Sequence, residues 1–260
     1  MNDLSLLHAR YVDNVLVFGH RGARAYAPMN TIPSFLLAVE QEADGIELDV
    51  WLSKDGHLVV IHNDTVDETT DGSGVVTEKT LAELKALDAG GWFGVPFLGT
   101  RIPTLDEVFQ AMPEDFLINV EIKKADNTSP ETDGVEAAVA ACIRRHQAQE
   151  RVIVSSFSLS ALEHFNHAMP ELPGGLAYLY ALPEQLDAAA EAALEMAFMH
   201  PLHEIVTDHL MNRHMDLGAL TNVWTVNDPA RMRDLIELGV NGIITDKPDV
   251  ARSVVNRLEA

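Results

Sequence analysis

Short runs of apolar residues recur along the chain, and segments with helical periodicity separate most of them. Several runs are apolar without interruption, which is typical of strands in a parallel sheet that is covered on both faces. We predict strands at nine runs: Val15–Gly19, Gly45–Trp51, Leu58–His62, Phe116–Ile122, Val152–Ser156, Gly175–Tyr180, Ala197–His200, Asn222–Val226 and Gly242–Thr245.

The intervening segments carry the start and stop signals of helices. Thr31 and Pro33 open one helical pattern, with Thr31 as the expected N-cap. Asp228 and Pro229 open another, which Gly239 ends. Alternation of strand and helix over 260 residues predicts an α/β fold, and about eight such units predict a TIM (β/α)8 barrel.

The second and third predicted strands are too close in sequence for a parallel connection. Asp55-Gly56 between them is typical of a hairpin turn, so these two strands are expected to pair antiparallel. A two-residue turn would place Asp49 opposite His62, and a four-residue turn would place Glu47 there. In either register His62 returns beside the acidic strand.

Residues 63–103 are too many for an ordinary connection between a strand and a helix. We interpret them as a small insertion over the C-terminal mouth of the barrel, before the next barrel strand. With no interdomain linker in the sequence, residues 1–260 are expected to form one domain.

Composition limits the possible partners. Forty acidic residues against 18 Lys and Arg give a net charge of −22, which argues against binding to nucleic acid or to anionic membranes. The chain shows no long uncharged apolar stretch and no signal-peptide pattern, so we expect neither a stable membrane anchor nor secretion. The single cysteine, Cys142, reads as a buried hydrophobe, and a cytoplasmic location is expected.

Polar side chains gather where predicted strands end. Glu47 and Asp49 are two residues apart, as are Glu121 and Lys123, so each pair shares one face of its strand. Polar residues at the C-terminal ends of barrel strands face the active site of a TIM barrel. Three converging carboxylates require a cation between them, and oxygen ligands suit Mg²⁺ or Ca²⁺.

Two histidines, His20 and His62, each end a predicted strand near these carboxylates. Imidazoles with a pKa near neutrality can act as general base and general acid. Arg21 and Lys123 supply fixed positive charge for an anion such as a phosphate. The segment GVNGIITDKP could cradle an anion at a helix N-terminus or form only a tight turn.

The sequence resembles the glycerophosphodiester phosphodiesterase family, one of the phospholipase-C-like phosphodiesterases built on TIM barrels. The resemblance runs in order from residue 19 to 248 and is carried by GHRGARAYAPMNT, DGIELDVWLSKDGHLVVIHNDTVDETTDGSG, IPTLDEVF, VEIK, SSFS, VWTVND and GIITDKP.

The resemblance implies a role for each matching residue. His20 and His62 match the catalytic acid/base pair. Arg21 and Lys123 match cations that contact the phosphate, and Trp224 matches an aromatic residue of the substrate pocket. Phe157 is a second pocket candidate, and a core position is the alternative for both aromatics. One divalent ion, Mg²⁺ or Ca²⁺, is implied on Glu47, Asp49 and Glu121.

Two residues depart from the family pattern. The family usually has Glu where this chain has Met29, and commonly has Asp where it has Asn63. Losses beside a metal site typically cost about 10- to 100-fold in affinity or activity, which is a handicap and not an abolition.

The implied reaction is metal-dependent hydrolysis of a glycerophosphodiester to glycerol-3-phosphate and an alcohol. Direct attack by water and attack through a cyclic phosphate are both compatible with the sequence. The alternatives are a related lipid phosphodiesterase of the phospholipase D or C type, or a non-catalytic binder of phosphodiesters. The pattern carries no prediction of head group or oligomeric state.

Overall fold

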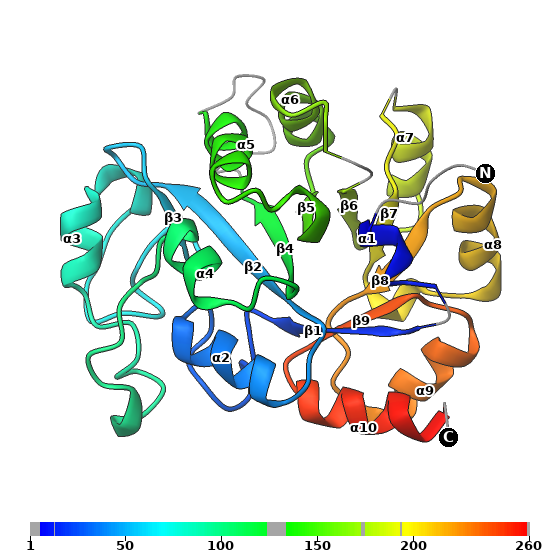
Figure 1. Ribbon diagram of the computed structural model, residues 1–260, viewed down its shortest axis with the longest axis horizontal. Helices are drawn as coiled ribbons and strands as arrows, with labels where there is room; N and C mark the ends of the chain where they lie inside the picture. Colours follow the sequence, from blue (N-terminus) through cyan, green and yellow to red (C-terminus); the bar gives the residue numbers. More distant parts are fainter. Residues whose placement is uncertain (1–5, 13, 124–133, 173–174, 193, 259–260) are drawn as a thin grey trace.

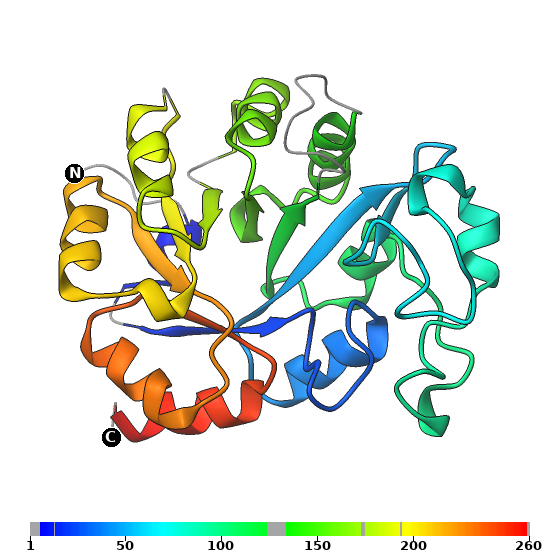
Figure 2. The same ribbon diagram turned by 180° about the vertical axis from the view of Figure 1, so that it is seen from behind.

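A closed barrel of parallel strands surrounded by helices dominates the computed structural model, which describes residues 6–12, 14–123, 134–172, 175–192 and 194–258 (Figure 1; seen from behind in Figure 2). The strands are β1 Leu16–His20, β2 Gly45–Leu52, β3 Leu58–Val60, β4 Leu117–Ile122, β5 Val152–Ser156, β6 Leu176–Tyr180, β7 Phe198–Pro201, β8 Leu220–Val223 and β9 Gly242–Thr245. The α-helices are α1 Leu6–Ala9, α2 Ile32–Glu40, α3 Leu81–Ala86, α4 Leu105–Ala111, α5 Val135–Arg145, α6 Leu159–Ala168, α7 Gln185–Glu191, α8 Asp208–Asp216, α9 Pro229–Glu237 and α10 Pro248–Leu258. The 3₁₀ turns are η1 Val76–Glu78, η2 Val95–Phe97, η3 Gln149–Arg151 and η4 His203–Ile205.

The barrel closes because β1 pairs in parallel with both β9 and β2. Among the described residues, β3 stands outside the parallel order and pairs antiparallel with the end of β2. The predicted TIM barrel is therefore confirmed, and so is the pairing of the second and third strands as a hairpin.

The hairpin register differs from both predicted alternatives by one residue. Val50 pairs with Val60, which places Ile61 opposite Asp49. The loop has three residues, and its last, Gly56, has a φ of +79°, which is the left-handed position of a three-residue hairpin loop. The hydroxyl of Ser53 also accepts from the backbone N–H of His57 at 2.9 Å, which stabilises this longer turn.

Two other local predictions needed correction. The eighth strand covers Leu220–Val223, earlier than the predicted Asn222–Val226, although the N–H of Val226 still donates to the carbonyl of Ile244 in β9 at 3.0 Å. Thr31 does precede α2, but its hydroxyl donates to the carbonyl of Pro28 at 2.5 Å and caps nothing. Asp228 caps α9 as predicted, accepting from the N–H of Ala230.

The inside of the barrel is filled by large apolar side chains at the amino-terminal ends of the strands. Leu16, Phe18 and Phe198 pack there against Leu7 and Tyr11 from the N-terminal segment. A second and larger core lies between the strands and the surrounding helices. Because the lower barrel is closed, a ligand can reach the strands only from their carboxyl ends.

Residues 63–103 contain η1, α3 and η2 and lie beside the β2–β3 hairpin (Figure 1). They have a small core of their own, in which Val66, Val76 and Leu84 pack against Trp51 of β2. Among the described residues, each helix is too short or too polar to cross a lipid bilayer.

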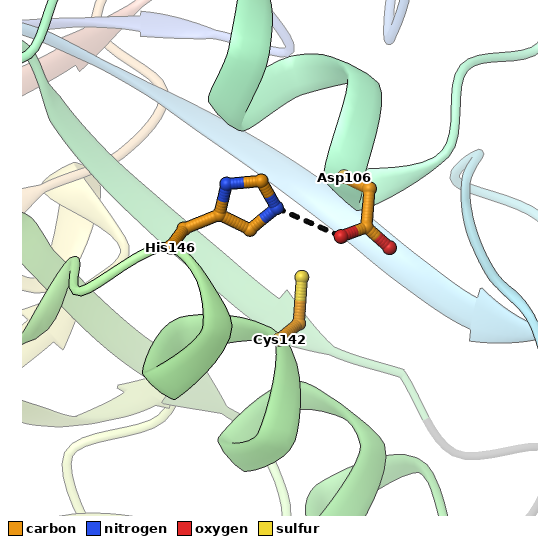
Figure 3. A group of neighbouring side chains, drawn as sticks. All are labelled: Asp106, Cys142 and His146. Atoms are coloured by element: carbon orange, nitrogen blue, oxygen red, sulfur yellow. Dashed lines mark hydrogen bonds and ion pairs between the residues drawn. The ribbon is translucent and has the colours of Figure 1, made fainter.

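One group of potential metal ligands lies between α4 and α5. Asp106, Cys142 and His146 approach one another there (Figure 3). Both oxygens of Asp106 already accept from Arg145, and Oδ1 also lies 2.7 Å from Nε2 of His146. Burial raises the pKa of the Cys142 thiol to about 12, so the thiol is protonated at neutral pH. We therefore interpret the group as an ion pair that joins the two helices beside a buried thiol.

Candidate active site

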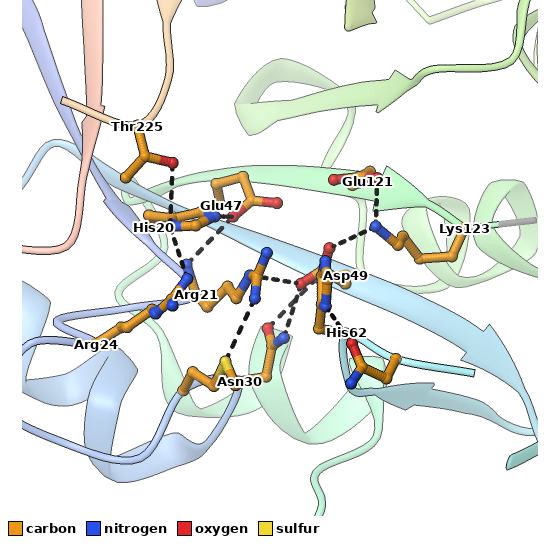
Figure 4. Close-up of polar contacts among 12 residues, drawn as sticks. His20, Arg21, Arg24, Asn30, Glu47, Asp49, His62, Glu121, Lys123 and Thr225 are labelled. Atoms are coloured by element: carbon orange, nitrogen blue, oxygen red, sulfur yellow. Dashed lines mark hydrogen bonds and ion pairs between the residues drawn. The ribbon is translucent and has the colours of Figure 1, made fainter. Parts of the chain in front are cut away.

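The carboxyl ends of three neighbouring strands carry the polar residues predicted to be functional. His20 ends β1, Glu47 and Asp49 lie on β2, and Glu121 lies on β4. The strand registers place His20 beside Glu47 and Asp49 beside Glu121. Since alternate residues of a strand share a face, all four side chains point into the mouth of the barrel (Figure 4).

Glu47, Asp49 and Glu121 form a buried acidic cluster. Each offers one carboxylate oxygen, and these three atoms lie within 4.8 Å of one another. Burial, with Asp49 and Glu121 nearby, raises the pKa of Glu47 well above its usual range. Burial and Asp49 raise the pKa of Glu121 to about 7. Glu47 and Glu121 are therefore harder to ionise than ordinary carboxyl groups, and a cation among them would favour their ionised form.

Two cations and an amide surround Asp49. Nε of Arg21 lies 3.2 Å from its Oδ2, and Nζ of Lys123 lies 3.4 Å from its Oδ1 and 2.8 Å from Oε1 of Glu121. Nδ2 of Asn30 donates to Oδ2 of Asp49 at 2.8 Å. Although burial acts in the opposite direction, Arg21 and Lys123 hold the pKa of Asp49 well below its usual range. Asn30 was not predicted, although it directly follows Met29 in the GHRGARAYAPMNT motif.

The residues present fit a divalent cation. Among the described residues, Oδ1 of Asp49 is buried and accepts no hydrogen bond, although it makes the ion pair with Lys123 at 3.4 Å. The three candidate ligands offer only oxygen, which hard cations such as Mg²⁺ and Ca²⁺ prefer. A cation among them would also offset the burial and the carboxylate repulsion that raise the pKa of Glu47 and Glu121.

His20 is held by a carboxylate that sequence reasoning missed. Its Nδ1 lies 2.7 Å from Oδ1 of Asp246, and its Nε2 lies 3.9 Å from Oε2 of Glu47. Burial lowers the pKa of His20, and the contact with Asp246 partly offsets this. Asp246 directly follows Thr245, which pairs with Gly19 across the β1–β9 contact. An acid directly after the last predicted strand was the available signal.

Asp246 gives the segment GVNGIITDKP a contact that the sequence did not predict. The segment presents a carboxylate to His20 directly after β9. The other oxygen of Asp246 accepts from Nδ2 of Asn227 at 2.8 Å.

His62 reaches the same mouth from the end of the hairpin. Its Nδ1 lies 2.6 Å from Oδ1 of Asn63, and the indole N–H of Trp51 donates to its carbonyl at 3.1 Å. Burial lowers the pKa of His62, and the charge of Asp49 partly offsets this. Both histidines therefore have an acceptor at Nδ1, which leaves Nε2 as the free nitrogen of the neutral ring.

A cavity of about 210 Å³ lies between these groups. Both histidines, both cations, Glu47 and Glu121 line it, and Phe157 and Trp224 form part of its wall. The two aromatic rings meet edge to face with centroids 5.5 Å apart. The structure thus brings together all the predicted site residues, with Asp49 buried just behind the lining.

The thioether of Met29, one of the two departures from the family pattern, lies beside Arg21. Nη1 of Arg21 is 3.4 Å from Sδ of Met29, and the Met29 side chain is buried. A thioether is only a weak acceptor, so Arg21 is directed chiefly at Asp49.

The sequence also matches known proteins over most of its length. The model of the Glycerophosphoryl diester phosphodiesterase family matches residues 20–250. The chain belongs to this family. As a member of the glycerophosphodiester phosphodiesterases, it is an enzyme that hydrolyses phosphodiesters.

Relatives of this family cover nearly the whole chain. The glycerophosphodiester phosphodiesterase of Caldanaerobacter subterraneus subsp. tengcongensis is 43% identical over 243 residues, which are 93% of this chain and 98% of the relative. That of Bacillus subtilis is 33% identical over 261 residues, covering 93% and 87% of the two chains.

Solved structures of the family share the fold. A putative glycerophosphoryl diester phosphodiesterase from Silicibacter pomeroyi has a TM-score of 0.81 at 28% identity and covers 94% of each chain. A phosphodiesterase from Oleispira antarctica, solved in complex with the product sn-glycerol-3-phosphate, has a TM-score of 0.80 at 29% identity over 95% of this chain and 98% of its own.

Proposed function

We propose that the chain hydrolyses glycerophosphodiesters to sn-glycerol-3-phosphate and an alcohol, with one divalent metal ion and with His20 and His62 as the acid/base pair. One observation carries the proposal: both imidazoles line a single cavity together with two carboxylates and two cations. The sn-glycerol-3-phosphate bound to the Oleispira antarctica relative supports a small-molecule substrate of this kind.

Each side chain around the cavity has a chemical task in this proposal. Arg21 and Lys123 bind the phosphoryl oxygens and stabilise the charge that builds on them. One histidine removes a proton from the attacking hydroxyl, and the other protonates the leaving alcohol. Since Nδ1 of each ring has an acceptor, both transfers take place at Nε2.

Glu47, Asp49 and Glu121 would hold the metal ion, for which we propose Mg²⁺ or Ca²⁺. When bound, such an ion supplies Lewis-acid polarisation of oxygen atoms and neutralises negative charge. Phe157 and Trp224 provide an apolar wall for the carbon skeleton of the substrate and restrict the entry of water.

A panel assay tests this function against its rivals. Glycerophosphocholine, glycerophosphoethanolamine and a lysophospholipid are incubated with Mg²⁺, Ca²⁺ or EDTA. The products measured are glycerol-3-phosphate from the two glycerophosphodiesters, and lysophosphatidate or monoacylglycerol from the lysophospholipid. We expect turnover of the glycerophosphodiesters, and its loss in EDTA with recovery on adding metal. Preference for the lysophospholipid would indicate the lipid phosphodiesterase, and binding without turnover would indicate the non-catalytic relative.

Replacement of His20 tests the acid/base assignment. His20→Ala should lower kcat by about 100-fold or more, because general acid–base catalysis typically contributes about 10²- to 10⁴-fold. His209→Ala, at an exposed position on α8, is the matched control and should leave kcat unchanged. Activity of His20→Ala close to that of the wild type would sink the assignment.

We further propose that the chain forms one domain and acts in the cytoplasm. The described strands close a single barrel, which supports one folding unit. Cys142 is a free, buried thiol, and free thiols are typical of reducing compartments.

A further inference from the structure

We propose that Glu68, an exposed residue outside the cavity, orients His62 through the side-chain amide of Asn63. The inference rests on the proposed catalytic role of His62 and adds a positioning residue to it. It also assigns a purpose to Asn63, which stands where the family commonly has Asp.

The contacts of Asn63 determine which way its amide points. Nδ2 of Asn63 donates to Oε2 of Glu68 in a short hydrogen bond. A carboxylate has only acceptors, so the amide nitrogen must face Glu68 and the amide oxygen must face the other way. That oxygen lies 2.6 Å from Nδ1 of His62.

The orientation of the amide then determines the tautomer of His62. An amide oxygen can only accept, so Nδ1 of His62 must carry a hydrogen and Nε2 of the neutral ring is free to take up a proton. Asp49 favours protonation of the ring, and Arg21 and Lys123 oppose it. These charges act on the ring as a whole and do not select one nitrogen. The hydrogen-bond contact at Nδ1 is made by Asn63, so the tautomer depends on Asn63.

Removing Glu68 would release the amide without moving the backbone of His62. The carbonyl of His62 is held separately by the indole of Trp51, at 3.1 Å. A rotated amide would present its N–H groups to Nδ1 and place the ring hydrogen on Nε2, where the proposed proton transfer takes place. Glu68 therefore acts on the reaction through Asn63 and touches no reacting atom.

The same contacts predict that positions 63 and 68 depend on each other. Asn63→Asp alone would put two carboxylates against one another, since Oε2 of Glu68 is already in hydrogen-bond contact with the group at 63. In Glu68→Lys the new ammonium can only donate, so it would attract the amide oxygen away from His62. The double variant Asn63→Asp/Glu68→Lys restores an acceptor for Nδ1 and a donor for the group at 63.

The experiment measures kcat and KM for glycerophosphocholine with Mg²⁺ in these variants. We expect Glu68→Lys to lower kcat roughly 10- to 100-fold with little change in KM, because a wrong tautomer affects the reaction step and not binding. The decrease in kcat should be much smaller for Glu68→Gln, because its side-chain oxygen can still accept from Asn63. The double variant should recover most of the kcat that either single substitution loses. Asp64→Lys, an exposed charge reversal in the same loop, should leave kcat unchanged.

Three outcomes would overturn the inference. These are a kcat of Glu68→Lys within about twofold of the wild type, a double variant no better than its worse parent, or losses of kcat that follow a loss of thermal stability. His62→Ala separates this from the proposed function. An active His62→Ala refutes the role of His62 itself, whereas an inactive one beside an active Glu68→Lys refutes only the positioning by Glu68.

Discussion

At the scale of single residues, Asp246 shows how one carboxylate determines the state of a neighbouring ring. Its two oxygens accept from Nδ1 of His20 and from Nδ2 of Asn227. The amide of Asn227 cannot turn, because its own oxygen accepts from the N–H of Asp246 and from the hydroxyl of Thr245. His20 is therefore held with its hydrogen on Nδ1.

Asp246→Asn is expected to lower kcat by roughly 100-fold or more, as loss of the correct tautomer does in other His-dependent enzymes. The oxygen of the new amide would be taken by Asn227, so its NH₂ group would face Nδ1 of His20. Steady-state kinetics on glycerophosphocholine give the result. Asn227→Ala, which frees the amide at 246 to rotate, should partly rescue Asp246→Asn, and a single variant with unchanged kcat would contradict the argument.

Met29 provides a second prediction at this scale. Met29→Glu would place a carboxylate beside Arg21, now 3.4 Å from the thioether, and add negative charge near the acidic cluster. We expect Mg²⁺ or Ca²⁺ to bind about 10-fold more tightly, in line with the effect of groups that support metal ligands. Isothermal titration calorimetry measures this. Met29→Gln, equal in size but neutral, should leave the affinity unchanged, and equal affinities in both variants would mean that position 29 serves packing alone.

At the scale of elements, the loop between β1 and α2 depends on close backbone packing. Gly22 has a φ of +86°, and a Cβ there would lie 2.7 Å from the backbone carbon of Ser34 in α2. The same loop carries Arg21 and Asn30, both of which contact Asp49. The geometry of the acidic cluster therefore relies on this one glycine.

Gly22→Ala should lower the free energy of unfolding by at least about 2 kcal/mol more than Gly239→Ala, because it adds steric overlap to an unfavourable φ. Gly239 has a similar φ of +90°, but a Cβ added there would meet nothing within 4 Å, so it isolates the cost of the backbone conformation. Urea denaturation of both variants provides the comparison. Equal losses would show that α2 can move away at little cost.

At the scale of the whole molecule, buried neutral histidines couple folding to pH. Burial, with a contribution from Arg213, lowers the pKa of His214 to about 4, and burial lowers the pKa of His200 to about 3. Below the usual histidine pKa of about 6.5, the unfolded chain binds protons that the folded chain does not. The contribution of these two histidines to the free energy of unfolding is therefore fully present above about pH 6.5. It is lost as the pH falls toward their pKa values in the folded protein.

His214→Gln should therefore weaken the pH dependence of stability. Between about pH 6 and pH 5 we expect the free energy of unfolding to fall by about 1 kcal/mol less in the variant than in the wild type, since one group contributes up to about 1.4 kcal/mol per pH unit. Urea denaturation at both pH values tests this. His209→Gln, at an exposed position, should behave as the wild type does, and parallel curves for all three proteins would refute the linkage.

The local pattern of the chain was enough to predict the barrel and to point to most residues of the candidate site. Buried strands leave uninterrupted apolar runs in the sequence, and amphipathic helices leave a periodic pattern. Both patterns are local, so they predict strands and helices without knowledge of the fold. Glu47 and Asp49 are two apart on one strand, and their shared direction follows from strand geometry alone. Capping by Asp228 is likewise local and was predicted correctly.

Tertiary structure decided what depends on residues far apart in sequence. Asp246 meets His20 across 226 positions only because closure of the barrel places β9 beside β1, and no periodicity within either strand encodes that contact. The hairpin register depended on a three-residue loop that Ser53 and Gly56 stabilise. This loop places Ile61, and not His62, opposite Asp49. The sequence by itself determined which residues lie at the strand ends, and three-dimensional packing determined which of them touch and in which protonation state they are held.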